Sequence, residues 1–130
     1  MKKGKLTKMF FIVIFINVLS TGIYAQSSNN EQRIVGTWTG GYEYWHPKHG
    51  GDGLDSGVTM VFNSDGTVRV RKSSNEEFRI MKFGISTSRM LIGRTIYDYF
   101  FSPNGTLFLY ESWIDDEGIH RYIYTLRKNT

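Results

Sequence analysis

The sequence predicts an all-β domain, a small antiparallel up-and-down β-barrel of eight strands. After residue 34, short segments alternate apolar or aromatic residues with polar ones, and hardly any stretch has helical periodicity. Most connections between these segments are two to five residues long, the range of antiparallel hairpins. Neighbouring hairpins hide their sheet edges by closing into a barrel, whereas a Greek-key sandwich, the alternative, suits this strand order less well. We therefore assign residues 34–128 to one barrel domain.

Residues 1–25 have the layout of a secretory signal peptide. Lysines at positions 2, 3, 5 and 8 precede an apolar run over residues 9–19, and a more polar stretch leads to Ala25. We expect cleavage between Ala25 and Gln26 and an exported protein, periplasmic or extracellular. An uncleaved membrane anchor is the alternative, but the apolar run is shorter than the ~20 residues that a spanning helix needs. The sequence contains no cysteine, which excludes a lipoprotein anchor.

The net charge of +4 comes from this leader. Its four lysines belong to the 16 Lys and Arg residues, and it contains no acidic residue, so cleavage leaves 12 basic residues against 12 acidic ones. A neutral chain gives no support to nucleic acid or an anionic membrane as a partner. The remaining ~105 residues suffice for one domain, and without disulfides that domain depends on dense apolar packing.

The start of the exported chain predicts a tail, a strand and a long loop. Residues 26–33 are polar and predict a flexible N-terminal tail. The first strand follows over residues 34–45, with a bulge or bend at Gly40 and Gly41. Residues 46–56 contain a proline and three glycines, so we expect them to form the longest loop.

The remaining strands are separated by compact turns. Residues 63–66 (NSDG), 73–75, 93, 102–105 (SPNG) and 115–118 (DDEG) carry turn-forming residues. The segments between them alternate in the manner of half-buried strands. These strands are expected over residues 58–62, 68–71, 78–83, 89–92, 95–101, 106–113 and 119–127.

The opening Gly36-Thr37-Trp38 resembles the Gly-x-Trp start of lipocalins and of small bacterial lipocalin-like domains. The turn-and-strand phrases over residues 61–67 and 101–107 are similar to those of the bacterial domains, and the likeness covers most of residues 33–128. The resemblance implies a lipocalin-like barrel in which Gly36 and Trp38 are structural. It also implies that a basic residue of the last strand, Arg127 or Arg121, packs over the tryptophan.

The chain departs from the carrier lipocalins in several ways. It is shorter and has no disulfide and no C-terminal helix. Only Asp98-Tyr99 resembles part of the second lipocalin sequence motif. Its size is closer to that of small exported barrel inhibitors of secreted proteases, the serralysin-type metalloprotease inhibitors and the potempins. In the serralysin inhibitors a short polar N-terminal segment enters the protease cleft. The resemblance implies a similar role for the tail residues Gln26, Ser27 and Ser28.

Catalytic and metal chemistry find little support in the sequence. The sequence has neither a cysteine nor a Gly-x-Ser-x-Gly elbow that could supply a nucleophile. The adjacent carboxylates that could act as general acid and base lie at predicted turns, where they are exposed to solvent, so we do not expect an enzyme. One loop contains His46, His49, Asp52 and Asp55 at spacings that a zinc or calcium ion could use. Such a loop is more often a hydrophilic connection, so no metal or other cofactor is expected. His120 stands alone and is expected at the surface.

Aromatic and apolar residues flank two of the predicted loops. In an eight-strand meander the loops over residues 46–56 and 114–118 open on the same rim, so they should be neighbours. Large side chains there either cap the barrel core or anchor a protein partner. In the second case Ile114 would enter a protease pocket and Asp115 would place a carboxylate near the protease metal. The candidate contact residues at the rim are Trp45, His46, Pro47, His49, Trp113, Ile114, Asp115 and Asp116.

Two functions are consistent with these sequence features, and cavity volume separates them. The first is a protein-binding barrel that inhibits a secreted protease or binds another envelope protein through rim loops or its N-terminal tail. The alternative is a lipocalin-like carrier of a small apolar ligand; a structural envelope module is a third possibility. A filled barrel favours the first, and a cavity of several hundred Å³ favours the carrier. The aromatic residues expected inside are bulky, which ranks the protein-binding function first.

Overall fold

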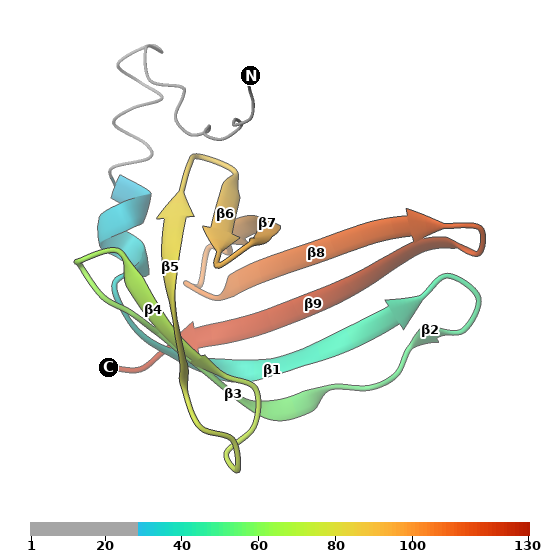
Figure 1. The fold of residues 1–130 in the computed structure, drawn as a ribbon, viewed down its shortest axis with the longest axis horizontal. Helices are drawn as coiled ribbons and strands as arrows, with labels where there is room; N and C mark the ends of the chain where they lie inside the picture. Colours follow the sequence, from blue (N-terminus) through green and yellow to red (C-terminus); the bar gives the residue numbers. More distant parts are fainter. Residues whose placement is uncertain (1–28) are drawn as a thin grey trace.

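The computed structural model describes residues 29–130, and these residues form the predicted closed antiparallel barrel of eight strands with one short additional strand (Figure 1). The predicted signal peptide and tail residues Gln26–Ser28 lie outside the described residues. In the described residues no helix is long and apolar enough to cross a membrane. The strands are β1 (Gly36–His46), β2 (Gly50–Gly51), β3 (Asp55–Phe62), β4 (Thr67–Arg71), β5 (Arg79–Ile85), β6 (Arg89–Ile92), β7 (Thr95–Phe101), β8 (Leu107–Asp115) and β9 (Gly118–Lys128).

The sheet follows the chain order and closes through a long pairing of β1 with β9. This pairing extends from Trp38↔Lys128 to Trp45↔Arg121. β2 is the additional strand: Gly50 and Gly51 fold back on the end of β1. The segment predicted as one long loop is therefore a small hairpin followed by the first residues of β3.

The predicted bulge in the first strand is confirmed. The register between β1 and β3 shifts between Gly40 and Gly41. On the other side of β1 the backbone of β9 comes so close that a Cβ atom at Gly40 would lie 1.9 Å from the carbonyl oxygen of Thr125. A side chain is therefore excluded at this point of the closing seam.

One end of the barrel is closed by Trp38 and a helix. Residues 29–34 are helical, although residues 29–33 were predicted to belong to a flexible tail and Ile34 to begin the first strand. The Trp38 side chain is 2% exposed, and its indole N–H donates to the carbonyl of the fully buried Ile34, 2.7 Å away. Asn30 is also buried and donates to the Tyr99 hydroxyl at 2.7 Å. The helix is thus part of the barrel floor, since it contributes a buried apolar residue and a buried polar one.

The cation over Trp38 is Lys128, not the predicted Arg127 or Arg121. The Lys128 ammonium lies 5.6 Å from the Trp38 ring centre and donates to the Arg33 carbonyl at 2.9 Å. Arg127 and Arg121 are exposed, because both alternate with the inward residues of β9. The predicted structural role of Gly36 agrees with its φ of +136°, which favours glycine, and a Cβ atom at this residue would lie only 2.6 Å from the Lys128 side chain.

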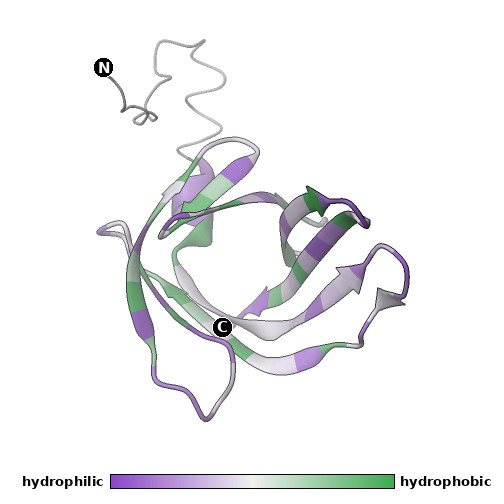
Figure 2. Ribbon diagram, turned by 45° about the vertical axis from the view of Figure 1, so that its right-hand side comes forward, coloured by the Kyte–Doolittle hydropathy of each residue, from purple (hydrophilic) through white to green (hydrophobic). Residues whose placement is uncertain are grey.

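The core occupies the half of the barrel next to this floor. Hydrophobic and hydrophilic residues alternate along the strands of the barrel (Figure 2). Inward residues from nearly every strand are buried and pack against one another. The largest fully buried side chains are those of Trp38, Tyr124, Phe62, Ile34, Met60, Met90, Leu107, Leu109 and Leu126.

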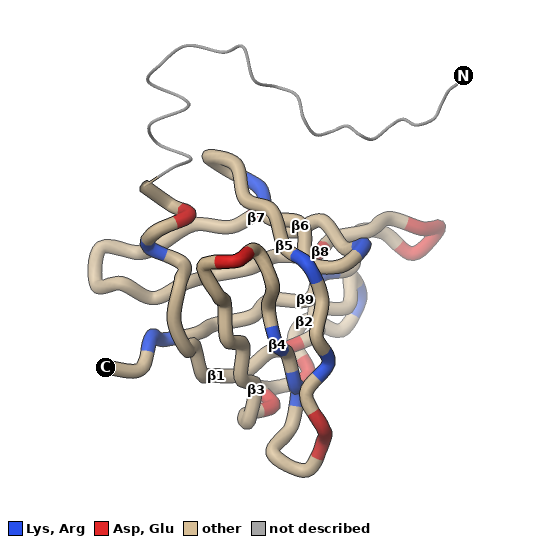
Figure 3. The backbone as a smooth tube through the Cα atoms, turned by 60° about the vertical axis from the view of Figure 1, so that its left-hand side comes forward, with Lys and Arg blue, Asp and Glu red and all other residues tan. Residues whose placement is uncertain are grey.

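Charged residues occur at both ends of the barrel and are most frequent at the end opposite the helix (Figure 3). Acidic residues lie in the turn between β8 and β9 and in the loop between β4 and β5, while basic residues lie along β4 and β5 (Figure 3). The turns after β1, β4, β6 and β8 all lie at this end, opposite the helix. The described chain is therefore a cup, closed at the helical end and open where these turns meet.

Candidate functional site

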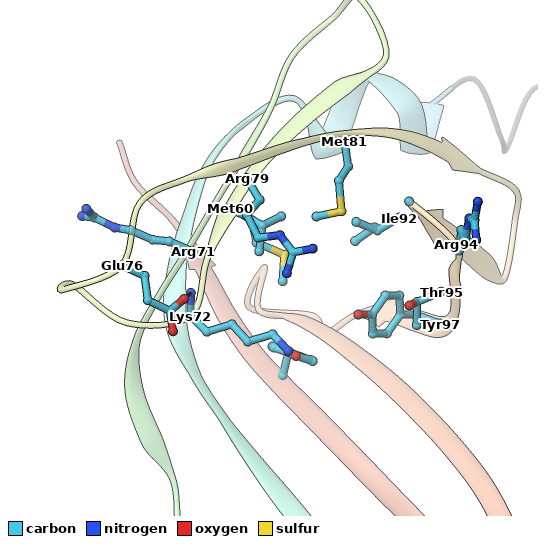
Figure 4. Close-up of a pocket in the computed structure, with 13 residues that line it drawn as sticks. Met60, Arg71, Lys72, Glu76, Arg79, Met81, Ile92, Arg94, Thr95 and Tyr97 are labelled. Atoms are coloured by element: carbon cyan, nitrogen blue, oxygen red, sulfur yellow. Dashed lines mark hydrogen bonds between the residues drawn. The ribbon is translucent and has the colours of Figure 1, made fainter.

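The open end of the barrel contains a cavity with a volume of about 510 Å³. Strands β3 to β7 and β9 line it, and it reaches down to core residues. The side chains of Met60, Met81, Ile92 and Tyr97 point into the space (Figure 4). The full lining is Met60, Val70, Arg71, Lys72, Glu76, Arg79, Met81, Ile92, Gly93, Arg94, Thr95, Tyr97 and Tyr124.

Two cations enter this cavity from above its apolar floor. Arg79 lies on the inward face of β5, two residues before Met81, and its guanidinium points into the space (Figure 4). Lys72 reaches across from the end of β4, and its ammonium lies 5.8 Å from the ring centres of both Tyr42 and Tyr124. Arg71 alternates to the outer side, where its guanidinium stacks 4.5 Å from the Phe78 ring. The cavity therefore presents positive charge to whatever occupies it.

Two tyrosine hydroxyls add polar groups to the cavity wall. Burial raises the pKa of Tyr97, and the neighbouring Tyr124 and Glu111 raise it further. Burial likewise raises the pKa of Tyr124, with a second contribution from Glu111. Both phenols are therefore protonated at neutral pH, and because the two hydroxyls also interact with each other, the pair offers one free donor to the cavity. Apolar walls with a few convergent polar groups are typical of small-molecule sites.

An aromatic wall leads from the cavity along the inner face of β1 and β9. Tyr42 stacks on Tyr124 with ring centres 5.4 Å apart and contacts Tyr122 at 6.1 Å. Tyr44 continues the row, 5.3 Å from Tyr122. Trp113 of β8 packs on Tyr44 and Tyr122, so this predicted contact residue belongs to the inner face. Period-two alternation in β1 and β9 placed these rings on one face, but only barrel closure made them adjacent.

The prediction that the first and last rim loops are neighbours is confirmed. His46 Nε2 lies 3.3 Å from Glu117 Oε1, and the Lys48 ammonium lies 3.8 Å from Glu117 Oε2. Pro47 packs so closely on Gly118 that a Cβ atom added at Gly118 would lie 2.9 Å from the Cβ atom of Pro47. Because β1 pairs with β9 as far as Trp45↔Arg121, the turns beyond these residues must meet.

His120 is buried, so its expected surface position is wrong. Its side chain is held between Tyr44, whose hydroxyl lies 2.6 Å from Nδ1, and Asp115, whose Oδ2 lies 2.8 Å from Nε2. The His120 imidazole at this distance lowers the pKa of the Asp115 carboxyl. Burial and the negative charges nearby raise the pKa of Tyr44, so its hydroxyl remains protonated and is a poor nucleophile. The alternation of His120 with Tyr122 and Tyr124 was the signal that could have identified it as inward-facing.

The four loop residues whose spacing a metal ion could use do not gather as a set. His46 and His49 stack with ring centres 4.6 Å apart, but Asp55 has entered β3, opposite Tyr42. Asp52 follows β2, where its amide donates to the Tyr44 carbonyl. His46 instead approaches the acidic turn of the β8–β9 hairpin. The partners of His46 therefore come from a segment about seventy residues further along the chain, which local spacing cannot reveal.

The outer face of the same end carries exposed apolar residues. Trp45 is 44% exposed, Ile114 74% and Ile119 53%. Ile114 lies opposite Ile119 in the hairpin, while Trp45 and Ile119 line one shallow groove. Asp115 follows Ile114 but turns inward to His120, so the two side chains lie on opposite faces of β8. The hypothesis that Ile114 and Asp115 enter one protease cleft stays a prediction, which now requires the cleft to contact both faces of β8. Asp116 is exposed at the turn.

A scan against protein-family models finds no match for this chain, and a search of curated proteins finds no relative.

Proposed function

We propose that this chain binds a small amphiphilic molecule with an anionic head group in the open half of its barrel. The cavity of about 510 Å³ carries this proposal, because its size lies within the range of small-molecule sites. The sequence ranked protein binding first on the expectation of a filled barrel. The core leaves this cavity at the open end of the barrel. The groove at the outer rim has a similar volume of about 520 Å³, so the position of the cavity inside the barrel and its lining, together with its volume, favour the carrier.

The chemistry of the lining defines the class of ligand. Met60, Met81 and Ile92 offer apolar surface to a hydrocarbon chain, while Lys72 and Arg79 stand above them. A carboxylate, sulfate or phosphate at the level of Lys72 and Arg79 would form charge-assisted hydrogen bonds with both cations. The paired hydroxyls of Tyr97 and Tyr124 provide a further donor at the wall.

Fluorescence titration with dodecanoate, and with dodecanol as a neutral ligand of the same length, tests this proposal. The variant Lys72→Met/Arg79→Met should bind dodecanoate about tenfold or more weakly, because two charge-assisted contacts are lost. Its affinity for dodecanol should be unchanged. Lys82→Met is the matched control, since Lys82 is exposed and alternates to the outer face of β5.

Filling the cavity is the second arm of the experiment. Met81→Trp places a large ring in the space and should abolish binding of both ligands while the far-ultraviolet circular dichroism spectrum stays that of the parent. Equal loss of dodecanoate binding in Lys82→Met and in the double variant would refute the role of the inward cations. Unchanged binding in Met81→Trp would place the ligand elsewhere.

Protein binding at the outer rim is the second candidate function, in its most specific form the inhibition of a secreted protease. The contiguous exposed side chains of Trp45, Ile114 and Ile119 favour it, because aromatic and apolar anchors dominate the energy of protein interfaces. Capture experiments with the proteins of the native secretome, followed by peptidase assays, test this candidate. Ile114→Ser/Ile119→Ser should abolish capture or inhibition, whereas Ile80→Ser, at a distant residue that is 71% exposed, should not. Inhibition of no peptidase by the parent protein would reject the protease hypothesis.

A further inference from the structure

We propose that the tip formed by β1 and the β8–β9 hairpin binds one divalent transition-metal ion, with Zn²⁺ the best fit, through His46, Asp115, Glu117 and His120. Ligand atoms of Asp115, Glu117 and His120 all lie within 4.8 Å of one another. His46 approaches from the other loop, with Nε2 3.3 Å from Glu117 Oε1. The cluster shares no residue with the barrel cavity, so this site is independent of the proposed ligand function.

The buried imidazole of His120 points to a missing partner. His120 is 4% exposed, and its Nε2 is buried without a hydrogen bond in the described part of the structure. Asp115 Oδ2 is only 2.8 Å away, but the distance alone does not make a hydrogen bond, because the oxygen lies off the direction in which a ring N–H points. A buried ring nitrogen that lies beside two carboxylates, in contact with one of them but without an aligned hydrogen bond, has the disposition of a metal ligand.

The chemistry of the donor set suits zinc. Two imidazole nitrogens and two carboxylate oxygens are common zinc ligands, and bonds of ~2.0–2.1 Å in a tetrahedron place neighbouring ligand atoms ~3.3 Å apart. His46 Nε2 lies 3.3 Å from Glu117 Oε1, and His120 Nε2 lies 2.8 Å from Asp115 Oδ2. The ligand atoms of Asp115, Glu117 and His120 lie within 4.8 Å of one another, so side-chain rotations at the exposed Glu117 must accompany binding. Two carboxylates would also neutralise the charge of a divalent ion. The ammonium of Lys48, 3.8 Å from Glu117 Oε2, is a competing cation that the metal would displace.

The surroundings of His120 resemble the outer shell of a metal site. A ligating histidine uses its second ring nitrogen for a hydrogen bond that fixes the ring. Here Nδ1 lies 2.6 Å from the Tyr44 hydroxyl, and the Trp113 indole stacks on the imidazole with centres 5.0 Å apart and planes inclined by 6°. These contacts hold Nε2 towards the carboxylates. A bound ion would join β1 to the β8–β9 hairpin in a chain that contains no cysteine.

Zinc titration of the purified protein by calorimetry tests the site, with Zn²⁺ alone as the probe. The parent should bind one ion, and the thermal midpoint should rise with Zn²⁺ and fall again with EDTA. Glu117→Gln and His46→Gln should each weaken binding at least tenfold. Asp116→Asn is the matched control, because it removes an exposed neighbouring carboxylate that is not part of the cluster. Lys48→Met should strengthen binding, since the competing ammonium is gone.

Co²⁺ provides a readout of geometry. Tetrahedral coordination by nitrogen and oxygen gives intense visible absorption, and this absorption should disappear in Glu117→Gln but persist in Asp116→Asn. Glu117 is a partly exposed turn residue, so its variant should keep the parent's circular dichroism spectrum. Absence of a one-to-one Zn²⁺ isotherm in the parent would overturn the proposal. So would equal loss of affinity in Asp116→Asn and Glu117→Gln, which would indicate only diffuse attraction to surface acids.

Discussion

Gly40→Ala should open the closing seam of the barrel. A Cβ atom at residue 40 would lie 1.9 Å from the Thr125 carbonyl oxygen, whereas real contacts of this kind are essentially never shorter than 3.0 Å. The obstacle is backbone, which cannot rotate away as a flexible side chain can. Gly40 does not have a positive φ, so the steric clash alone determines the outcome.

The size of the effect follows from the displacement that the methyl group requires. β9 must move away from β1 by more than 1 Å at the pairs Gly40↔Leu126 and Gly41↔Thr125. That movement weakens the neighbouring ladder hydrogen bonds and loosens the packing of the fully buried Leu126. Overpacking and weakened hydrogen bonds together should lower the free energy of unfolding by about 2–4 kcal/mol. For a domain of this size the thermal midpoint should fall by at least about 8 °C.

Urea unfolding followed by far-ultraviolet circular dichroism measures this change. Gly84→Ala is the matched control, because a Cβ at Gly84 meets no atom within 4 Å and Gly84 also has no positive φ. The control should be neutral or stabilised by about 0.5 kcal/mol, through lower entropy of the unfolded chain. A Gly40→Ala protein as stable as Gly84→Ala would refute the argument that close backbone contact at this seam closes the barrel.

Three further predictions concern the barrel floor, the stability of the protein at alkaline pH, and the tip formed by β1 and the β8–β9 hairpin. Trp38→Phe removes the donor to the buried Ile34 carbonyl and should lower the free energy of unfolding by about 1–3 kcal/mol in urea titrations. Burial raises the pKa of Tyr99 from 10.0 to about 12. The contribution of the protonated Tyr99 to stability is therefore complete below pH 10 and is lost as the pH rises towards 12. Thermal midpoints measured from pH 8 to 12 should decline in the parent, and Tyr99→Phe should flatten this decline. Gly118→Ala, at φ +126° and against Pro47, should cost about 1–3 kcal/mol and speed hydrogen exchange at the tip, and exchange equal to the parent's would contradict this.

Much of the barrel was predictable because its signals are local. Alternation identified the strands over residues 89–92 and 95–101 with the bounds that the structure has. The pair Gly40-Gly41 indicated the bulge, and the resemblance carried by Gly36-Thr37-Trp38 implied a structural role for Trp38. Strand order followed from the short turns, since adjacent segments joined by a few residues pair with each other.

The errors have a common physical origin in contacts between distant segments. Residues 29–34 lack a helical pattern of apolar residues, and their helix is held by Trp38 and Tyr99. Lys128, and not the predicted neighbour Arg127, covers Trp38. The register of β1 on β9 decides which side chain lies over the tryptophan, and the spacing along β9 does not reveal it. The cluster at the tip could not be predicted from spacing, because His46 and His120 are more than seventy residues apart.

The sequence by itself determined an all-β chain, the order of its strands, the faces that alternate, and the glycines that bend the first strand. These properties depend on neighbouring residues and on the fixed two-residue period of a strand. Only the tertiary structure decided how deeply the core fills the barrel, which cations enter the cavity and which polar residues meet at the tip. These depend on twist, stagger and side-chain length summed around the closed sheet, and no local pattern encodes that sum.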